Sequence, residues 1–258
     1  MQRSAIRPSP VFLAILAVAV AGGLLVAFGQ PENYFAGDPG WAVQLGTFLL
    51  VIGGWGVSLC LHEFGHAIVA YRGGDREVYF KGYLTLDPRR YTDPVFSLVL
   101  PLLLLAIGGI PLPGGAVWIN HHALRSKRVD SMVSLAGPFS NLAIGLLLIV
   151  AVGVFQPSTA LGGALSFLAL LQVLAFVLNI LPIPGLDGWG AIEPYLSWEA
   201  QRFGAKARPW APLILFAVLI GIPAVGQAFF GLADGVFGLV GGDEFLSDVG
   251  NYAFFFWR

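Results

Sequence analysis

The sequence predicts an all-α polytopic membrane protein with about five to six transmembrane helices and a small β-hairpin or re-entrant region. Three observations lead to this fold class. Of the 258 residues, 57% are hydrophobic and only 11% are charged, whereas soluble domains carry about 25% charged residues. So few charges cannot cover a water-facing surface of ordinary size. The apolar residues also form uncharged runs that are long enough to cross a bilayer as helices.

The first two predicted helices lie in the N-terminal quarter of the chain. Residues 11–28 form an uncharged run after a short basic segment. This run is longer than the 7–15 apolar residues of a signal peptide and no clear small-residue cleavage site follows, so we expect a retained helix. The run Gln44 to Tyr71 would extend over roughly 42 Å as a helix. We expect it to end near Gly73 and Gly74, because glycine is a common helix C-cap.

The pattern changes between residues 75 and 130. Apolar residues and a glycine alternate with polar or aromatic ones over 78–86, which predicts a strand or hairpin, and 116–119 is a candidate second strand. Residues 95–110 are apolar but short and contain Pro101. We expect this run to dip into the membrane and return, or to lie on its surface; the alternative is a true extra span.

Three further spans complete the predicted fold, at 131–155, 161–181 and 209–230, the last of them kinked at Pro223. We therefore expect one membrane-embedded domain over residues 1–258. Its core would be 43–190, flanked by the spans 11–28 and 209–230.

The distribution of Lys and Arg predicts the orientation. These residues gather in the N-terminal segment and in three loops, at 72–90, 125–128 and 202–208, whereas the loops at 29–42 and 156–160 have none. By the positive-inside rule the basic segments are cytoplasmic. This predicts a multi-pass protein of the cell membrane with a cytoplasmic N-terminus, and it requires residues 73–130 to make no net crossing.

A His-Glu-x-x-His set lies inside the second predicted span. On a helix His62 and His66 are one turn apart and present their imidazoles to the same point. This is the geometry of two zinc ligands, with Glu63 beside them as a general base. Ionisable groups inside a membrane are costly to insert, which favours a functional site over a chance match or a pair of interhelical hydrogen bonds. We expect the site to hold one Zn²⁺ per chain.

A catalytic zinc site needs a third protein ligand and an open position. Asp187 is the best candidate, because it follows a span in a Pro/Gly-rich turn that cannot stay helical, on the same side of the membrane as the His pair. His121 and His122 remain alternatives, although they lie in a polar loop. Asp187 could also be an ordinary turn aspartate.

Other function classes find less support in the sequence. A net charge of −1 and the lack of a basic cluster with interleaved aromatics argue against nucleic acid as a partner. A transporter or ion relay that uses the His/Glu set would predict inverted repeats, and no internal repeat is evident. An inactive scaffold relative would be expected to lack Glu63 or a ligand. The oligomeric state is not predicted.

Three motifs together resemble the site-2 protease family of intramembrane zinc metallopeptidases. They are HEFGH at 62–66, GPFSN at 137–141 and NILPIPGLDG at 179–188, and they occur in the family's order over about half of the chain. The resemblance implies His62, His66 and Asp187 as zinc ligands and Glu63 as the catalytic base. The chain shows no PDZ or nucleotide-binding (CBS) insert and is similar to the minimal members.

The resemblance also implies that Asn141 and Asn179 engage the backbone of the substrate. Interhelical hydrogen bonding is the alternative for both. The expected partners are the lipid bilayer and transmembrane protein substrates, whose peptide bonds would be cleaved in or near their transmembrane segments. The strand-like segments at 78–86 and 116–119 would offer an edge for an unwound substrate, or would only brace the helices.

Overall fold

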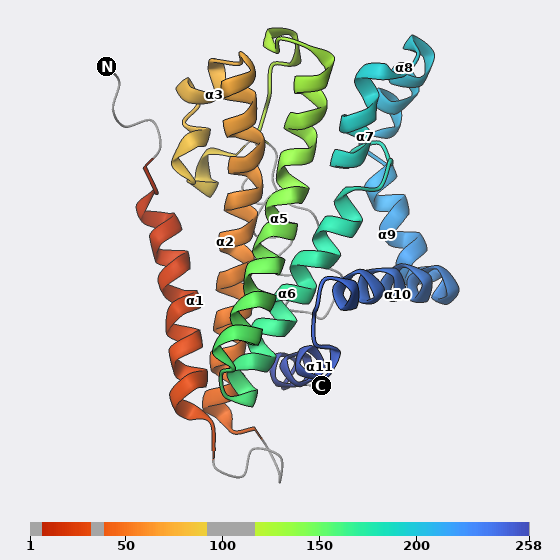
Figure 1. Cartoon of the computed structure of the whole chain (residues 1–258). Helices are drawn as coiled ribbons and strands as arrows, with labels where there is room; N and C mark the ends of the chain where they lie inside the picture. The colour runs from red at the N-terminus through yellow and green to blue at the C-terminus, as the bar shows by residue number, and fades with distance from the viewer. Residues whose placement is uncertain (1–6, 32–38, 92–116, 258) are drawn as a thin grey trace.

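Four long apolar helices form the body of the protein in the computed structural model, which describes residues 7–31, 39–91 and 117–257. They are α1 (Pro10–Gly29), α2 (Trp41–Gly73), α5 (Lys127–Phe155) and α6 (Thr159–Asn179). Each is long and apolar enough to cross a membrane, and they lie side by side in Figure 1. The helices α8 (Trp198–Ala207) and α9 (Ala211–Gly221) form a fifth candidate span if they are taken together, with a bend of 65°.

The helix ends follow from local sequence chemistry. Ser9 caps α1, because its hydroxyl oxygen accepts a hydrogen bond from the N–H of Phe12, and Pro10 occupies the first helical position. α2 ends at Gly73, and Gly74 follows with a φ of +130° that favours glycine. The predicted end of the second helix at these two glycines is therefore confirmed.

The predicted β-hairpin at 78–86 is wrong. This segment forms the short helix α3 (Glu77–Phe80) and a 3₁₀ turn, η1 (Tyr83–Thr85), and the described residues contain no strand. Gly82 lies between them with a φ of +75°, which lets the chain turn after one helical turn. Val78 and Leu84 are both buried against α2. The tight turn between them, and not the alternation of a strand, places these two apolar side chains on the same helix.

Two neighbouring predictions concern the chain before α5. Residues 117–119 do not form a strand, which corrects that part of the prediction for 116–119. The run 95–110, predicted to be re-entrant, lies outside the described residues.

The chain after α6 turns several times. α7 (Asp187–Ile192) and α8 follow it, and α9 then ends at Gly221. The span predicted at 209–230 is not one helix. The predicted kink at Pro223 is a complete break, because α10 (Pro223–Leu239) begins at this proline, which has no N–H to continue a helix. Figure 1 shows α10 running across the direction of the long helices, and α11 (Glu244–Phe254) completes the chain.

The end of α2 and the start of α5 meet at the same end of the molecule. The N–H of Arg125 donates to the carbonyl of Gly73 over 3.1 Å. Gly73 and Arg125 therefore lie at the same end of the bundle, as the distribution of basic residues predicts. Figure 1 shows α3, the start of α5 and α8 at this end, whereas the end of α1, the start of α2 and the α5–α6 connection lie at the other.

A glycine lets α2 and α5 approach closely beside the His-Glu-x-x-His set. A Cβ atom on Gly65 would lie 2.8 Å from the carbonyl oxygen of Ala136 and 2.7 Å from the hydroxyl oxygen of Ser140. Only glycine fits such a helix contact without a shift of the backbone, as in other membrane helix pairs. This contact brings the histidine face of α2 against α5.

Candidate metal centre

The two histidines of α2 face one point inside the helix bundle. His62 and His66 are 5% and 7% exposed, and Glu63 is 2% exposed. Their Nε2 atoms are 3.0 Å apart. The ligand-capable atoms of these three residues lie within 4.8 Å of one another, which is compact enough for one metal ion. The one-turn spacing of the motif therefore produces the predicted convergence.

Asp187 joins the imidazole pair from the start of α7. Its Oδ2 atom lies 3.2 Å from Nε2 of His62, and its Oδ1 atom lies 3.4 Å from Nε2 of His66. The chain reaches this place because α7 folds back onto the end of α6. A Cβ atom on Gly188 would collide with the carbonyl of Ile180, so glycine is required beside Asp187. The structure thus brings together the three residues that the sequence predicts as ligands.

The hydrogen bonds of both imidazoles fix their tautomers. Nδ1 of His66 lies 2.7 Å from the carbonyl oxygen of Val133, and Nδ1 of His62 lies 2.5 Å from Oδ1 of Asn141. Both partners are acceptors, so each Nδ1 carries the proton and donates it. A neutral imidazole has a single N–H, which leaves a lone pair on each Nε2. Two nitrogen lone pairs and a carboxylate therefore point at one another.

This donor set fits a divalent cation of the size of zinc. Tetrahedral coordination with bonds of about 2.0–2.1 Å separates neighbouring ligand atoms by roughly 3.3–3.4 Å. The observed separations among the two Nε2 atoms and the Asp187 carboxylate are 3.0, 3.2 and 3.4 Å. Donors this close together are stabilised either by a shared proton or by a cation among them. Both the spacing and the protonation of the three side chains therefore suit a metal.

Glu63 lies beside the three donors, where its carboxylate is held by the backbone. Its Oε2 atom accepts a hydrogen bond of 3.0 Å from the N–H of Val117. The segment that follows Val117 is anchored near the end of α2, because the N–H of Asn120 donates to Asp75 over 2.8 Å. Lys81 of the α3–η1 turn also lies over the ring of Trp118. No pattern in the sequence predicts this backbone support of Glu63.

Asn141 binds the ring nitrogen of His62 that faces away from the candidate metal position. Its Oδ1 atom accepts from His62, and its Nδ2 donates over 2.8 Å to Oε1 of Gln172 in α6. Asn141 and Gln172 are 2% and 0% exposed. Asn179 instead donates to the carbonyl of Ala175, one turn back in α6. Contact with a substrate stays a prediction for both asparagines, and Gln172 is a site residue that the motifs did not reveal.

Gly137 and Pro138 of the GPFSN motif lie on α5, next to the two imidazoles. A Cβ atom on Gly137 would collide with Nε2 of both His62 and His66. Pro138 has no N–H to donate to the preceding turn of α5, which loosens that turn. The carbonyl that loses its helix donor is that of Ser134, and the carbonyl of the neighbouring Val133 accepts from His66. A Gly-Pro pair inside an apolar helix is the sequence signal that could have indicated this role.

The other histidine candidates lie elsewhere. His121 and His122 are exposed in the 3₁₀ turn η4 (His121–Ala123). Nδ1 of His121 is hydrogen-bonded to Oδ1 of Asp130 over 2.6 Å, and this contact raises the pKa of the imidazole.

Comparison with curated proteins places this centre in a known family. The chain is 45% identical to a protein of Mycolicibacterium smegmatis named "Putative zinc metalloprotease Rip2", over 99% of this chain and 96% of that protein. It is 46% identical to the protein of the same name from Mycobacterium tuberculosis H37Rv, with the same two coverages. "Putative zinc metalloprotease YwhC" of Bacillus subtilis is 33% identical over 65% of this chain and 78% of its own length.

Two other comparisons gave no match: no family model and no solved structure matches the chain. The likeness to the Rip2 proteins extends over nearly the whole length of both proteins, so the aligned region spans the positions of the three motifs and the helices that carry them. Together with the convergence of His62, His66 and Asp187, it shows that the chain belongs to the site-2 protease family.

Proposed function

We propose that this protein is an intramembrane zinc metalloprotease that hydrolyses peptide bonds in or near transmembrane segments of other membrane proteins. The observation that carries the proposal is the convergence of both Nε2 atoms and the Asp187 carboxylate on one point, while each Nδ1 contacts a hydrogen-bond acceptor on its other side. The names of the Rip2 relatives support zinc as the metal and proteolysis as the reaction. One zinc per chain would be held by His62, His66 and Asp187.

The zinc, when bound, would lower the pKa of a water molecule and polarise the peptide carbonyl. Glu63 is the base that takes the proton from this water and later delivers it to the leaving amine. The N–H of Val117 holds one oxygen of Glu63 in place, and the second oxygen remains to accept the proton. Asn179 is proposed to hydrogen-bond the substrate backbone, as is Asn141 once a substrate rearranges its present contacts.

The location of the centre supports a membrane substrate. Seven residues separate His66 from the end of α2 at Gly73, which places the imidazoles about 10 Å inside that end of the helix. This end carries the basic loops, so we propose that it is cytoplasmic and that the N-terminus lies in the cytoplasm. A substrate helix buries its carbonyls in its own hydrogen bonds and must unwind locally before it is cleaved.

The test compares the wild-type protein with Glu63→Gln in proteoliposomes that contain a transmembrane reporter. We expect cleavage to fall by at least the factor of about 100 that a general base contributes, while the zinc content stays near one per chain. Glu199→Gln, which changes an exposed acid of α8 at the same end of the molecule, is the matched control and should cleave normally. Normal cleavage by Glu63→Gln would refute the proposed mechanism.

A further inference from the structure

α8 and α9 meet at a bend, which we call the elbow, and this bend packs against the loop that precedes Asp187. A Cβ atom on Gly185 would lie 2.8 Å from Pro212 and 3.0 Å from the carbonyl of Arg208, so this loop is pressed against the bend of the elbow. Gly204 of α8 lies directly against the ring of Trp189 in α7. Arg208 also forms an ion pair of 2.8 Å with Glu193. These contacts and the ion pair therefore hold α7, α8 and the loop before Asp187 in place around the elbow.

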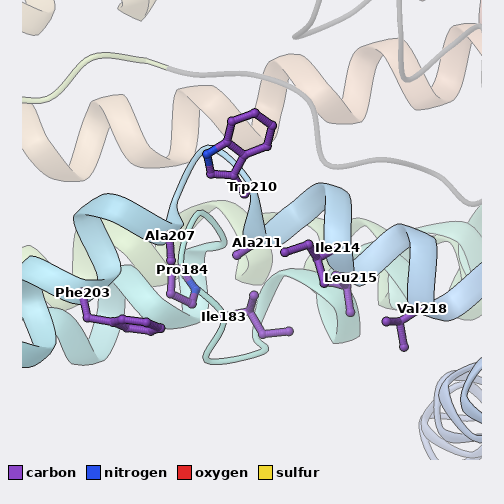
Figure 2. A pocket seen from close by; sticks show the side chains of 9 residues that line it. All are labelled: Ile183, Pro184, Phe203, Ala207, Trp210, Ala211, Ile214, Leu215 and Val218. Carbon is purple, nitrogen blue, oxygen red and sulfur yellow. The ribbon is translucent and has the colours of Figure 1, made fainter.

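An apolar cavity of about 370 Å³ lies inside this elbow. Figure 2 shows side chains from three segments gathered around it: Ile183 and Pro184 from the loop, Phe203 and Ala207 from α8, and Ile214 from α9. The nine lining residues are all apolar or aromatic. Ile214 is 61% exposed, so the cavity opens to the outside of the protein along α9.

The size and lining of the cavity select an acyl chain as its occupant. Its volume is at the small end of the range of roughly 300–1,000 Å³ for small-molecule sites. A helix of about 10–12 Å diameter is too wide to enter it, so a transmembrane segment of a partner could only cover its mouth. Nothing in the lining offers a charged group to a polar ligand. A lipid tail matches both the width and the chemistry.

Two cations lie at the edge of the cavity where a headgroup would be. Lys206 is adjacent to Ala207 and three residues after Phe203, so it flanks the helix face that lines the cavity. Arg202 is one turn before Lys206, and both are exposed. Among the described residues neither is in an ion pair within 4.0 Å, in contrast to Arg208. Two like charges at this spacing repel each other, and an anion between them would relieve the repulsion.

Aromatic residues place this edge at the membrane surface. Trp198, the first residue of α8, and Trp210, which precedes α9, are both exposed, and tryptophan is enriched at the level of lipid headgroups. We propose that the elbow is a binding site for one anionic phospholipid, with an acyl chain in the cavity and the phosphate between Arg202 and Lys206. Basic pockets beside transmembrane helices bind anionic headgroups in this way.

The first test measures lipid binding to the full chain. Delipidated protein is titrated with palmitoyl-oleoyl phosphatidylglycerol or with the matched phosphatidylcholine, and bound lipid is counted by native mass spectrometry. We expect one saturable phosphatidylglycerol that binds up to about 25-fold more tightly than phosphatidylcholine, from the attraction of two cations. Equal affinity for the two lipids, or binding that never saturates, would overturn the proposal.

Matched variants separate the headgroup from the tail. Arg202→Gln with Lys206→Gln should abolish the preference for phosphatidylglycerol, whereas Lys127→Gln, an exposed cation on α5, should keep it. Ile214→Trp should fill the cavity and weaken the binding of both lipids. Leu213→Trp is its control, because Leu213 is 62% exposed on the same helix and does not line the cavity.

Ile214 is exposed, so this substitution leaves the core packing intact, and an unchanged thermal midpoint confirms folding. Undiminished lipid binding by Ile214→Trp, or a dimer mass that replaces the lipid-bound monomer, would refute the proposed occupant. The measurements do not involve proteolysis, so they are independent of the proposed enzymatic activity.

Discussion

The substitution Asn141→Leu tests how much the support behind His62 contributes to metal binding. It removes the acceptor of the Nδ1 proton of His62 and also the donor to Gln172, and it changes the shape of the side chain little. Each buried polar group left unpaired costs about 1–3 kcal/mol, so two of them destabilise the protein by roughly 2–6 kcal/mol. Without its acceptor, His62 is also free to protonate Nε2, which cannot then bind a metal.

Loss of a hydrogen-bond partner behind a metal-binding histidine typically weakens the metal 10–100-fold, or about 1.4–2.7 kcal/mol. We expect a loss of this size for zinc in Asn141→Leu, measured by competition with a fluorescent chelator on the full chain in nanodiscs. Asn179→Leu is the matched control. Asn179 is equally buried in the same bundle but donates only to the backbone of Ala175, so its zinc affinity should stay unchanged.

A double variant identifies the role of Gln172. Gln172→Leu combined with Asn141→Leu removes the carbonyl that the single variant leaves unpaired, so the double variant should recover about 1–3 kcal/mol of stability. Its zinc affinity should match that of Asn141→Leu, because His62 lacks its acceptor in both. If Asn141→Leu binds zinc as tightly as the wild type, the inference that this amide fixes the His62 tautomer is wrong.

Three further outcomes follow from the structure. Gly137→Ala should displace both imidazoles and abolish zinc binding measured by mass spectrometry, whereas Gly153→Ala, in open space on the same helix, should not; equal binding would contradict the close contact. Removal of the metal by a chelator should lower the thermal midpoint, and zinc at about 1,000 times its dissociation constant should restore roughly 4 kcal/mol, but not in Asp187→Ala. His121 has a raised pKa in the folded protein because of Asp130, so its stabilisation is present below the unfolded pKa of about 6.5 and is lost as the pH rises through the folded value. The contribution is small because the side chain is 55% exposed. Asp130→Asn should remove this pH dependence of the thermal midpoint, and an unchanged dependence would refute it.

The sequence predicts the parts of the fold that depend on length and hydrophobicity. The spans at 11–28, 131–155 and 161–181 correspond to α1, α5 and α6 with shifts of a few residues at their ends. The basic loops predict that the end of α2 and the start of α5 lie on the same side, and the contact between Gly73 and Arg125 agrees with this. The hairpin prediction failed because an alternation of apolar residues over nine positions also fits a helical turn that is followed by a glycine-based bend.

The candidate site also has a part that the sequence predicts and a part that it does not. The approach of His62 to His66 is local, since it follows from a spacing of four residues on one helix, and the motif is sufficient to predict it. The hydrogen bonds that fix their protons come from Val133 and Asn141 on another helix, and Gln172 extends the network to a third. Such contacts depend on how closely the helices pack, which is set here by Gly65 and Gly137. The candidate metal ligands can therefore be predicted from the motifs, whereas the hydrogen bonds that orient them are a property of the assembled bundle.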